Sequence, residues 1–244
     1  MFRKELAVVM PVYNEEQIIA HVIEKWTREL LRLDIDFEIH AYNDGSKDNT
    51  LFILNEIANQ NKRLNIHNKK NSGHGPTLVQ AYRENSDREW IFQIDSDDEI
   101  GTEGFEELWE KRDSCNFLIG KRVRHAQPRI RRLISSLSRL SVRTLYGNGI
   151  HDVNSPYRLM KSAFFKELFF TLPKNMFAPN VAISGAVSRM KIPIYEKPIR
   201  QHPRKYGVVS IKKLKLFKAV VKSLYQTVIF RFKLPGMVYK SAAF

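Results

Sequence analysis

One cysteine, Cys115, is the only thiol in this chain of 244 residues. A single cysteine excludes an internal disulfide and a metal cluster built from several thiolates. It also fits a reducing compartment. Any metal chemistry must therefore come from oxygen or nitrogen ligands.

Long apolar runs are also missing. No stretch of 18 apolar residues occurs, so we expect no membrane-spanning helix. The basic start is followed by an apolar run that leads directly into Pro11 and then acids. This run is too short for a signal peptide, and the residues that follow it do not resemble a cleavage site. The chain also lacks a Walker A motif and a Rossmann Gly-x-Gly-x-x-Gly.

The composition is that of a folded globule with an excess of positive charge. Hydrophobic residues make up 43% and charged residues 27%, which is ordinary for a chain able to form one large α/β domain or two small ones. The net charge is +14, and the basic excess lies in residues 121–143 and after Arg189. Nucleic acid, an anionic membrane surface and a phosphorylated substrate are the partners that such charge suits.

Strand-like and helix-like segments alternate along the first half of the chain. Buried strands are predicted at Leu6–Val12, Phe37–Tyr42, Leu64–Asn68, from Trp90 onward and at Phe117–Gly120. Helices are predicted over 16–33, from Ser46 or Asp48 to Asn59, and from Pro76 to Glu84. This alternation predicts an α/β fold with a doubly wound parallel sheet, whose ligand-facing turns gather along one edge.

Polar turns follow the first three strands. Glu15 and Asp44 are candidates to accept hydrogen bonds from a base or a ribose. Gly73 and Gly75 would let the backbone approach a ligand closely. Ordinary turn chemistry explains the same residues equally simply, so each assignment stays open.

Four acids follow the fourth strand: Asp95, Asp97, Asp98 and Glu99. A strand core cannot hold so many carboxylates, so we place them where the strand leaves the sheet. On a continuing strand Asp95 and Asp97 would point to one face, and such oxygen ligands suit Mg²⁺ or Mn²⁺ holding a diphosphate. The alternative is a solvated acidic turn.

Three motifs carry a resemblance to a known family. They are Val8-Val9-Met10-Pro11-Val12-Tyr13-Asn14-Glu15-Glu16, Asn43-Asp44-Gly45-Ser46-Lys47-Asp48-Asn49-Thr50 and Asp95-Ser96-Asp97. In this order and spacing the chain resembles the family 2 glycosyltransferases with the glycosyltransferase-A fold. More narrowly, over about residues 5 to 210, it resembles the dolichyl-phosphate mannose synthase and polyprenyl-phosphate glycosyltransferase branch.

The resemblance implies a Rossmann-like, mostly parallel sheet flanked by helices, a nucleotide-diphosphate sugar donor, a divalent metal and inversion at the anomeric carbon. It places Pro11, Tyr13 and Glu15 in the nucleoside pocket and Asp95, Asp97 and Glu99 around the metal. Further donor-site candidates are Asn43, Asp44, Gly73, Ser96 and Arg158. Two positions depart from the family pattern, because Asn43 stands where Asp is usual and Glu99 where Gln is frequent.

The same resemblance assigns phosphate contacts to Arg122, Arg131 and Ser135, and also to Arg204. A solvated cationic helix face is the competing interpretation of these arginines. Asp152 becomes a candidate to position the acceptor or to act as general base. A buried structural pair of Asp152 with Arg158 competes with that role.

The acceptor decides how much a base matters. A sugar hydroxyl needs a proton removed, whereas a phosphate monoester, with a second pKa of about 6, is largely dianionic near neutral pH. An arginine-rich site with few candidate bases fits polyprenyl phosphate better than a hydroxyl.

The basic tail predicts a second unit. We divide the chain into a catalytic domain, 1–210, and a tail, 211–244, in which apolar residues alternate with lysines at helical spacing. Such a helix suits the anionic surface of a membrane, and packing of the helix on the domain is the alternative.

These observations predict a metal-dependent, inverting glycosyltransferase that acts on polyprenyl phosphate at the cytoplasmic leaflet of a membrane. A transferase that acts on a hydroxyl of a growing glycan and a non-catalytic basic binding subunit remain alternatives. Nucleic acid is not expected as a partner, since the acids would repel its phosphates. The sequence leaves open whether a membrane subunit or a homo-oligomer is needed.

Overall fold

The computed structural model of the chain describes residues 5–123, 136, 140–147, 149–203 and 213–234. Its strands are β1 (Leu6–Val12), β2 (Phe37–Asn43), β3 (Leu64–Asn68), β4 (Trp90–Gln93), β5 (Phe117–Val123), β6 (Arg158–Lys161) and β7 (Ile194–Arg200). Its helices are α1 (Ile19–Arg32), α2 (Thr50–Gln60), α3 (His74–Glu84), α4 (Phe105–Glu110), α6 (Ser162–Thr171), α7 (Pro179–Arg189) and α8 (Lys213–Lys233), with a 3₁₀ turn η1 (Arg112–Ser114).

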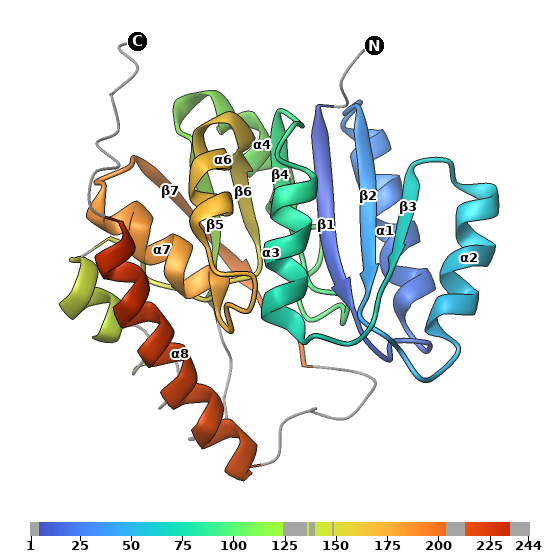
Figure 1. Cartoon of the computed structure of the whole chain (residues 1–244). Coiled ribbons are helices and arrows are strands. Elements are labelled where there is room, and N and C mark those ends of the chain that lie inside the picture. Colours follow the sequence, from blue (N-terminus) through green and yellow to red (C-terminus); the bar gives the residue numbers. More distant parts are fainter. Residues whose placement is uncertain (1–4, 124–135, 137–139, 148, 204–212, 235–244) are drawn as a thin grey trace.

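The strands of this part of the chain form one sheet in the order β3-β2-β1-β4-β6-β5-β7 (Figure 1). β1 runs parallel to β2 and β4, β2 to β3, and β5 to β7. β6 runs antiparallel to both β4 and β5. All described strands except β6 therefore end at the same edge of the sheet, which is where an open α/β fold binds its ligands.

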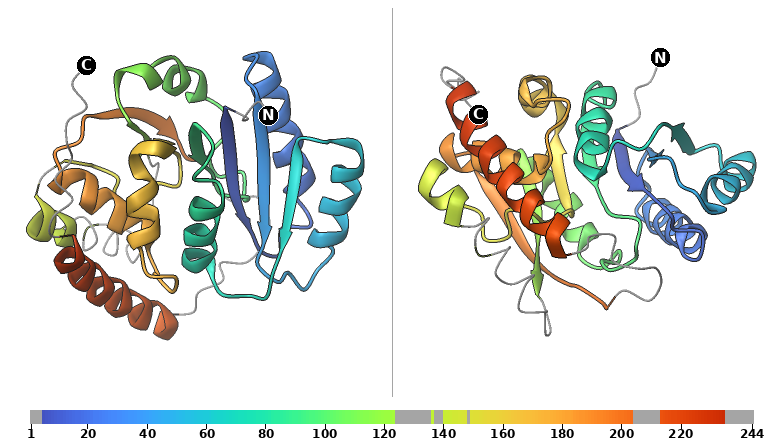
Figure 2. Two further views of the ribbon diagram at one scale, coloured as in Figure 1. Left: turned by 45° about the horizontal axis from the view of Figure 1, so that its top comes forward. Right: turned by 60° about the horizontal axis from the view of Figure 1, so that its bottom comes forward.

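Both faces of the sheet are covered by helices, which is why the central strands are apolar throughout. Every residue of β1 is buried, as expected for a strand between two helical layers. On one face Val8 and Met10 pack with residues of α1, including Val22 and Trp26. On the other face lie α3, α6 and α7 (Figures 1 and 2). The predicted mostly parallel α/β fold is confirmed.

Helix α8 packs on the catalytic fold, mainly against α7. Phe230 and Leu234 are buried, and the Tyr146 hydroxyl donates to the Thr227 carbonyl at 2.6 Å. The packed helix that the sequence left open is thus present. Among the described residues no helix is long and apolar enough to cross a membrane.

Candidate functional site

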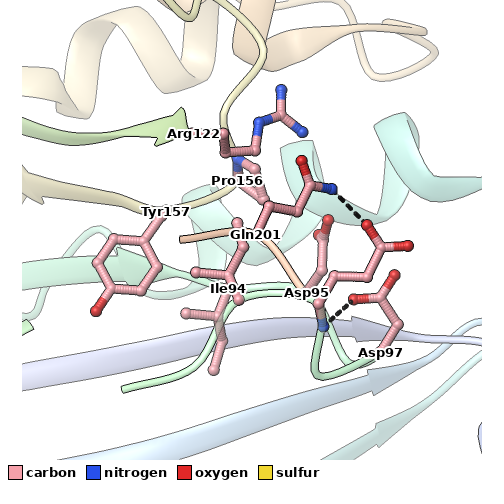
Figure 3. Close-up of a pocket in the computed structure, with 9 residues that line it drawn as sticks. Ile94, Asp95, Asp97, Arg122, Pro156, Tyr157 and Gln201 are labelled. Carbon is pink, nitrogen blue, oxygen red and sulfur yellow. Dashed lines mark hydrogen bonds between the residues drawn. The ribbon is translucent and has the colours of Figure 1, made fainter. Parts of the chain in front are cut away.

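A small pocket lies at the edge where β4, β5 and β7 end (Figure 3). Its cavity of about 20 Å³ has room for a ligand the size of one water molecule or ion. The lining residues are Ile94, Asp95, Asp97, Glu99, Ile100, Arg122, Pro156, Tyr157 and Gln201. The structure therefore brings together the three predicted metal-site acids and one of the predicted phosphate-binding arginines.

The acids reach the pocket from a turn and not from a strand. β4 ends at Gln93, and Asp98 takes a left-handed φ of 54°. The strand does not continue through Asp95 and Asp97, so strand alternation is not what brings them together. They still line one pocket because the turn folds back on itself, with the Glu99 backbone N–H donating to Asp97 Oδ1 at 3.2 Å.

The oxygen atoms of the pocket provide some of the ligands that a hard cation needs. Asp95 Oδ1 and Gln201 Oε1 are buried oxygens without a hydrogen-bond partner among the described residues. Such orphaned acceptors are costly unless a cation or a donor group meets them. Within the same part of the chain, no three His, Cys, Asp or Glu side chains are grouped closely enough to hold a metal ion. A cation here would therefore take further oxygen ligands from its substrate, as Mg²⁺ commonly does with phosphates.

Glu99 is fixed by the segment that follows β7. Its carboxylate accepts a hydrogen bond from Gln201 Nε2, and its carbonyl accepts one from the His202 backbone N–H at 2.7 Å. Figure 3 shows Gln201 in the space between Arg122 and the acids. Gln201 belongs to the pocket, yet sequence reasoning missed it. The available signal was its position in the chain, between the end of β7 and the predicted phosphate contact Arg204.

Arg122, near the end of β5, forms a partly buried ion pair with Asp152. Its Nε and Nη2 donate to Asp152 Oδ2 and Oδ1 at 2.7 and 2.8 Å. Burial alone would lower the pKa of Arg122, but the Asp152 carboxylate raises it above its ordinary value. The pair uses two of the five guanidinium N–H donors, so others remain for a phosphate. A carboxylate held in this way is a poor general base.

Arg158, at the start of β6, is fully buried and does not line the pocket. Its guanidinium donates to the carbonyls of Ser155 and Asn180, with distances of 2.6 and 3.2 Å from Nη2 and Nη1. Burial lowers its pKa to about 10. Arg158 thus holds the chain before β6 against α7, and the proposed structural pair of Asp152 with Arg158 is replaced by the pair with Arg122.

Asp44 joins two of the loops at this edge. It accepts hydrogen bonds from the backbone N–H groups of Ser72 and Gly73, both at 2.8 Å, and forms an ion pair with Lys69. Burial would raise the pKa of Asp44, but Lys69 and the two N–H groups together lower it. Asn43 is also engaged within the turn, donating to Asn68 Oδ1 at 2.8 Å. The two side chains therefore hold together the chain segments after β2 and β3, and their direct contact with a base stays a prediction.

The first loop is tied to the second in the same way. Asn14 donates its backbone N–H to Ser46 Oγ at 3.0 Å, and the Glu15 N–H donates to Thr50 Oγ1 at 2.8 Å. Pro11 and Glu15 are buried and Tyr13 is half-buried beside them in the chain. These residues, with the buried Ser96, lie at the ends of neighbouring strands, as a nucleoside site requires.

The two glycines of the third loop serve different purposes. Gly73 has a φ of +92° and open space around its α-carbon. Gly75 instead lies within α3, where an added Cβ would stand 2.3 Å from the carbonyl oxygens of Met176 and Phe177. The expected close approach at Gly75 is thus made by the protein's own backbone. The helix begins at His74, so Pro76 is its third residue and not its first.

Three predicted phosphate contacts, Arg131, Ser135 and Arg204, lie outside the described residues. They stay predictions. The strands that precede them in the chain are described: β5 comes before Arg131, and β7 comes before Arg204. β5 contributes Arg122 to the pocket, and Gln201, directly after β7, also lines it.

Comparison with known proteins identifies relatives of the chain. A model of the family described as "Glycosyl transferase family 2" matches residues 7–169. An undecaprenyl-phosphate 4-deoxy-4-formamido-L-arabinose transferase of Proteus mirabilis is 23% identical over 215 residues, covering 87% of this chain and 64% of the relative. A dolichyl-phosphate beta-glucosyltransferase of Trichomonas vaginalis is 35% identical over 109 residues, covering 42% of this chain and 32% of the relative. The chain thus spans less than two thirds of the length of these curated relatives.

Solved structures share the fold. Glucosyl-3-phosphoglycerate synthase from Mycobacterium tuberculosis, in complex with Mn²⁺, uridine diphosphate and phosphoglyceric acid, superimposes with a TM-score of 0.64 at 15% identity, covering 93% of this chain and 78% of that one. A mannosyltransferase from Pyrobaculum calidifontis, in complex with GDP-mannose and Mn²⁺, gives a TM-score of 0.58 at 13% identity, covering 95% and 74%.

Proposed function

The chain belongs to glycosyl transferase family 2, and we propose that it transfers a sugar from a nucleotide-diphosphate donor to a polyprenyl phosphate. The observation that carries the proposal is the pocket that joins Asp95, Asp97 and Glu99 to Arg122 at the carboxyl edge of the sheet. Acids suit a cation that neutralises a diphosphate, and an arginine suits a second phosphate.

At the donor end, Asp95 and Asp97 would hold Mg²⁺ or Mn²⁺, with Glu99 beside them. When bound, the ion supplies charge neutralisation for the departing nucleoside diphosphate. The protein's own contribution is to keep the acid turn in place, through the Gln201 and His202 hydrogen bonds to Glu99. The loops joined through Asp44 and Asn14 would form the wall for the nucleoside.

At the acceptor end, the partly buried pair of Arg122 and Asp152 favours a phosphate over a hydroxyl. A hydroxyl acceptor needs a free carboxylate as base, whereas both oxygens of Asp152 accept hydrogen bonds from Arg122. A phosphate monoester already carries its nucleophilic oxygen unprotonated. The guanidinium would hold that phosphate in line with the anomeric carbon.

The proposed reaction balances without an acid or a base. A phosphate oxygen of the acceptor forms a bond to the anomeric carbon while the bond from that carbon to the diphosphate oxygen breaks. The electron pair stays on the departing diphosphate, and the configuration inverts because attack and departure occur on opposite sides. We place the reaction at the cytoplasmic leaflet of a membrane, where a polyprenyl phosphate presents its head group.

The test is transfer of labelled sugar from a panel of nucleotide sugars to polyprenyl phosphate with Mn²⁺, using Asp97→Asn and Asp98→Asn as a matched pair. Asp98 does not line the pocket and instead pairs with Lys25 at 3.1 Å. We expect Asp97→Asn to lower kcat/KM by about a hundredfold or more. Asp98→Asn should stay within about threefold of the wild type. No lipid-soluble product with any donor, or equal activity of the two variants, would contradict the proposal.

A further inference from the structure

Helix α8 carries two apolar faces, and only one of them is used. The inner face, with Thr227 and Phe230, is buried against the rest of the domain, as is Leu234 directly after the helix. The outer face carries Val221, Tyr225, Val228 and Phe232, which are 50%, 66%, 37% and 71% exposed. Spacings of four, three and four residues place these side chains in a single stripe along the helix. We call this set the outer stripe.

The helix is fixed firmly enough to present the outer stripe in one direction. Arg231 Nε donates to the Leu145 carbonyl at 2.6 Å, and Gln226 Oε1 accepts from the Phe177 backbone N–H at 2.7 Å. Gln226 Nε2 also donates to the Asn175 carbonyl at 3.1 Å. These bonds anchor two separate segments to α8, the one around Leu145 and the one between α6 and α7, so the outer stripe cannot turn inward without breaking them.

The sequence that contains the outer stripe carries charge of one sign. From residue 197 to residue 244 the sequence contains twelve Lys or Arg and no Asp or Glu. Lys222 and Lys233, next to the two ends of the stripe, are exposed. Lysines beside an apolar stripe can extend their ammonium groups toward anionic head groups while the apolar side chains enter the acyl region.

We propose that the outer stripe of α8 docks the protein on an anionic lipid surface. This deepens the membrane location included in the proposed function, by naming the residues that touch the lipid. Tyr225 and Phe232 are the aromatic anchors, a type of side chain enriched at membrane interfaces. Basic residues near the surface add electrostatic attraction to anionic lipids.

A second copy of the chain fits the outer stripe less well. Two copies would bring together two segments that are both strongly basic, which is unfavourable. Four partly exposed side chains also provide far less than the roughly 800 Å² per partner of a standard protein interface. In Figure 1 the first turns of α8 lie on the side of the molecule where β1 and β2 end.

The experiment is co-sedimentation of the full chain with vesicles of phosphatidylcholine, with or without roughly 30 mol% phosphatidylglycerol. We expect the anionic vesicles to bind at least about tenfold more tightly, with the difference reduced at about 500 mM NaCl. Tyr225→Asp with Phe232→Asp should weaken binding by about tenfold or more.

Phe52→Asp is the matched control, because Phe52 is 66% exposed on α2, away from α8. It should change vesicle binding by less than about twofold. Asp97→Asn, measured without donor, should bind vesicles like the wild type, so a failure of catalysis and a failure of docking are told apart. Equal binding to neutral and anionic vesicles, or an equal loss in Phe52→Asp, would overturn the proposal. A further result would also overturn it: a dimer in sedimentation velocity that Tyr225→Asp with Phe232→Asp dissociates, while vesicle binding stays unchanged.

Discussion

The nitrogen and the oxygen of the Gln201 side-chain amide have different surroundings in the pocket. Its Nε2 donates to Glu99, whereas its Oε1 is buried without a partner among the described residues. An amide fixed at one end presents the other end as a preorganised acceptor for a donor-sugar hydroxyl or a cation.

Replacing Gln201 with Leu keeps the approximate volume of the side chain and removes both functions. We expect kcat/KM for the nucleotide sugar to fall by about tenfold or more. Glu99 would lose its hydrogen bond from Gln201 Nε2, and the site would lose the Gln201 Oε1 oxygen. Gln80→Leu is the control, since Gln80 makes the same kind of bond to Glu84, at 2.8 Å, on the exposed face of α3. Steady-state kinetics measures both, and an equal effect of the two changes would contradict a role for Gln201 in the site.

The pair of Arg122 and Asp152 makes a prediction about pH. As a positioning residue for Arg122, Asp152 should contribute to acceptor binding, so Asp152→Asn should raise the acceptor KM by about tenfold. The shape of the pH profile of kcat/KM should not change. Arg122→Lys, which keeps the charge but loses the planar fork, should behave similarly.

A general base would give the opposite result. Asp152→Asn would then lower kcat by about a thousandfold or more with little change in KM, and the acidic limb of the pH profile would disappear. Kinetics across the pH range therefore separates the positioning role from the base role.

Individual residues were predictable where one motif determines their place. The acids after Trp90 had to leave the sheet, because a buried strand cannot hold them, and they do line the pocket. Gln201 and the partner of Asp152 could not be predicted, because they depend on which strand ends lie side by side. Asp152 is 30 residues from Arg122 in the sequence, and no local pattern distinguishes Arg122 from Arg158 as its partner.

At the scale of elements, the loops after β1, β2 and β3 form a connected unit. Asn14 links the first loop to the second, and Asp44 links the second to the third. The shape of the proposed nucleoside wall therefore depends on a few hydrogen bonds between loops. Lys69 is central to them, because it reaches Asp44, Ser72 Oγ and Thr77 Oγ1.

Lys69→Met should destabilise the fold, because it leaves the Asp44 carboxylate, 4% exposed, without its cation. We expect the free energy of unfolding to fall by about 2–4 kcal/mol. Combining it with Asp44→Asn should cost less than the sum of the two single changes. Urea unfolding near neutral pH measures these effects, with Lys70→Met, at an exposed neighbouring site, as the control. Equal costs for Lys69→Met and Lys70→Met would contradict the prediction.

The pH dependence of this effect has a definite sign. The pKa of Asp44 is lowered in the folded state, so its contribution to stability is fully present above the unfolded value of about 4. That contribution is lost as the pH falls below this value. The difference between the wild type and Asp44→Asn should therefore close in acid.

Most elements were predictable because their apolar residues follow the period of a strand or a helix. β1 and β3 have the predicted bounds, and α1 carries its buried residues at helical spacing. The ends were less predictable. β4 stops at Gln93 because the turn of four acids begins directly after it, and α3 starts before Pro76 because Gly73 turns the chain with a positive φ.

At the scale of the whole molecule, the insertion of β6 between β4 and β5 determines the site. This antiparallel strand lets β5 and β7 run in the direction of β4, so their ends meet the acid turn. Its sequence, Arg158–Lys161, is only four residues long and has no distinctive period. The sheet order therefore could not be predicted from the sequence. The assembly of Arg122 and Gln201 around the acids depends on that order, so it could not be predicted either.

The central claim is that the acid turn holds a divalent cation together with a nucleoside diphosphate. Calorimetric titration of UDP and of GDP into the wild type and into Asp97→Asn, with Mn²⁺ and with a chelator, tests it most directly. We predict that Mn²⁺ tightens the binding of one nucleotide to the wild type by about tenfold or more, and that Asp97→Asn removes this gain. Binding that ignores Mn²⁺, or a gain from Mn²⁺ that survives in Asp97→Asn, would contradict the account.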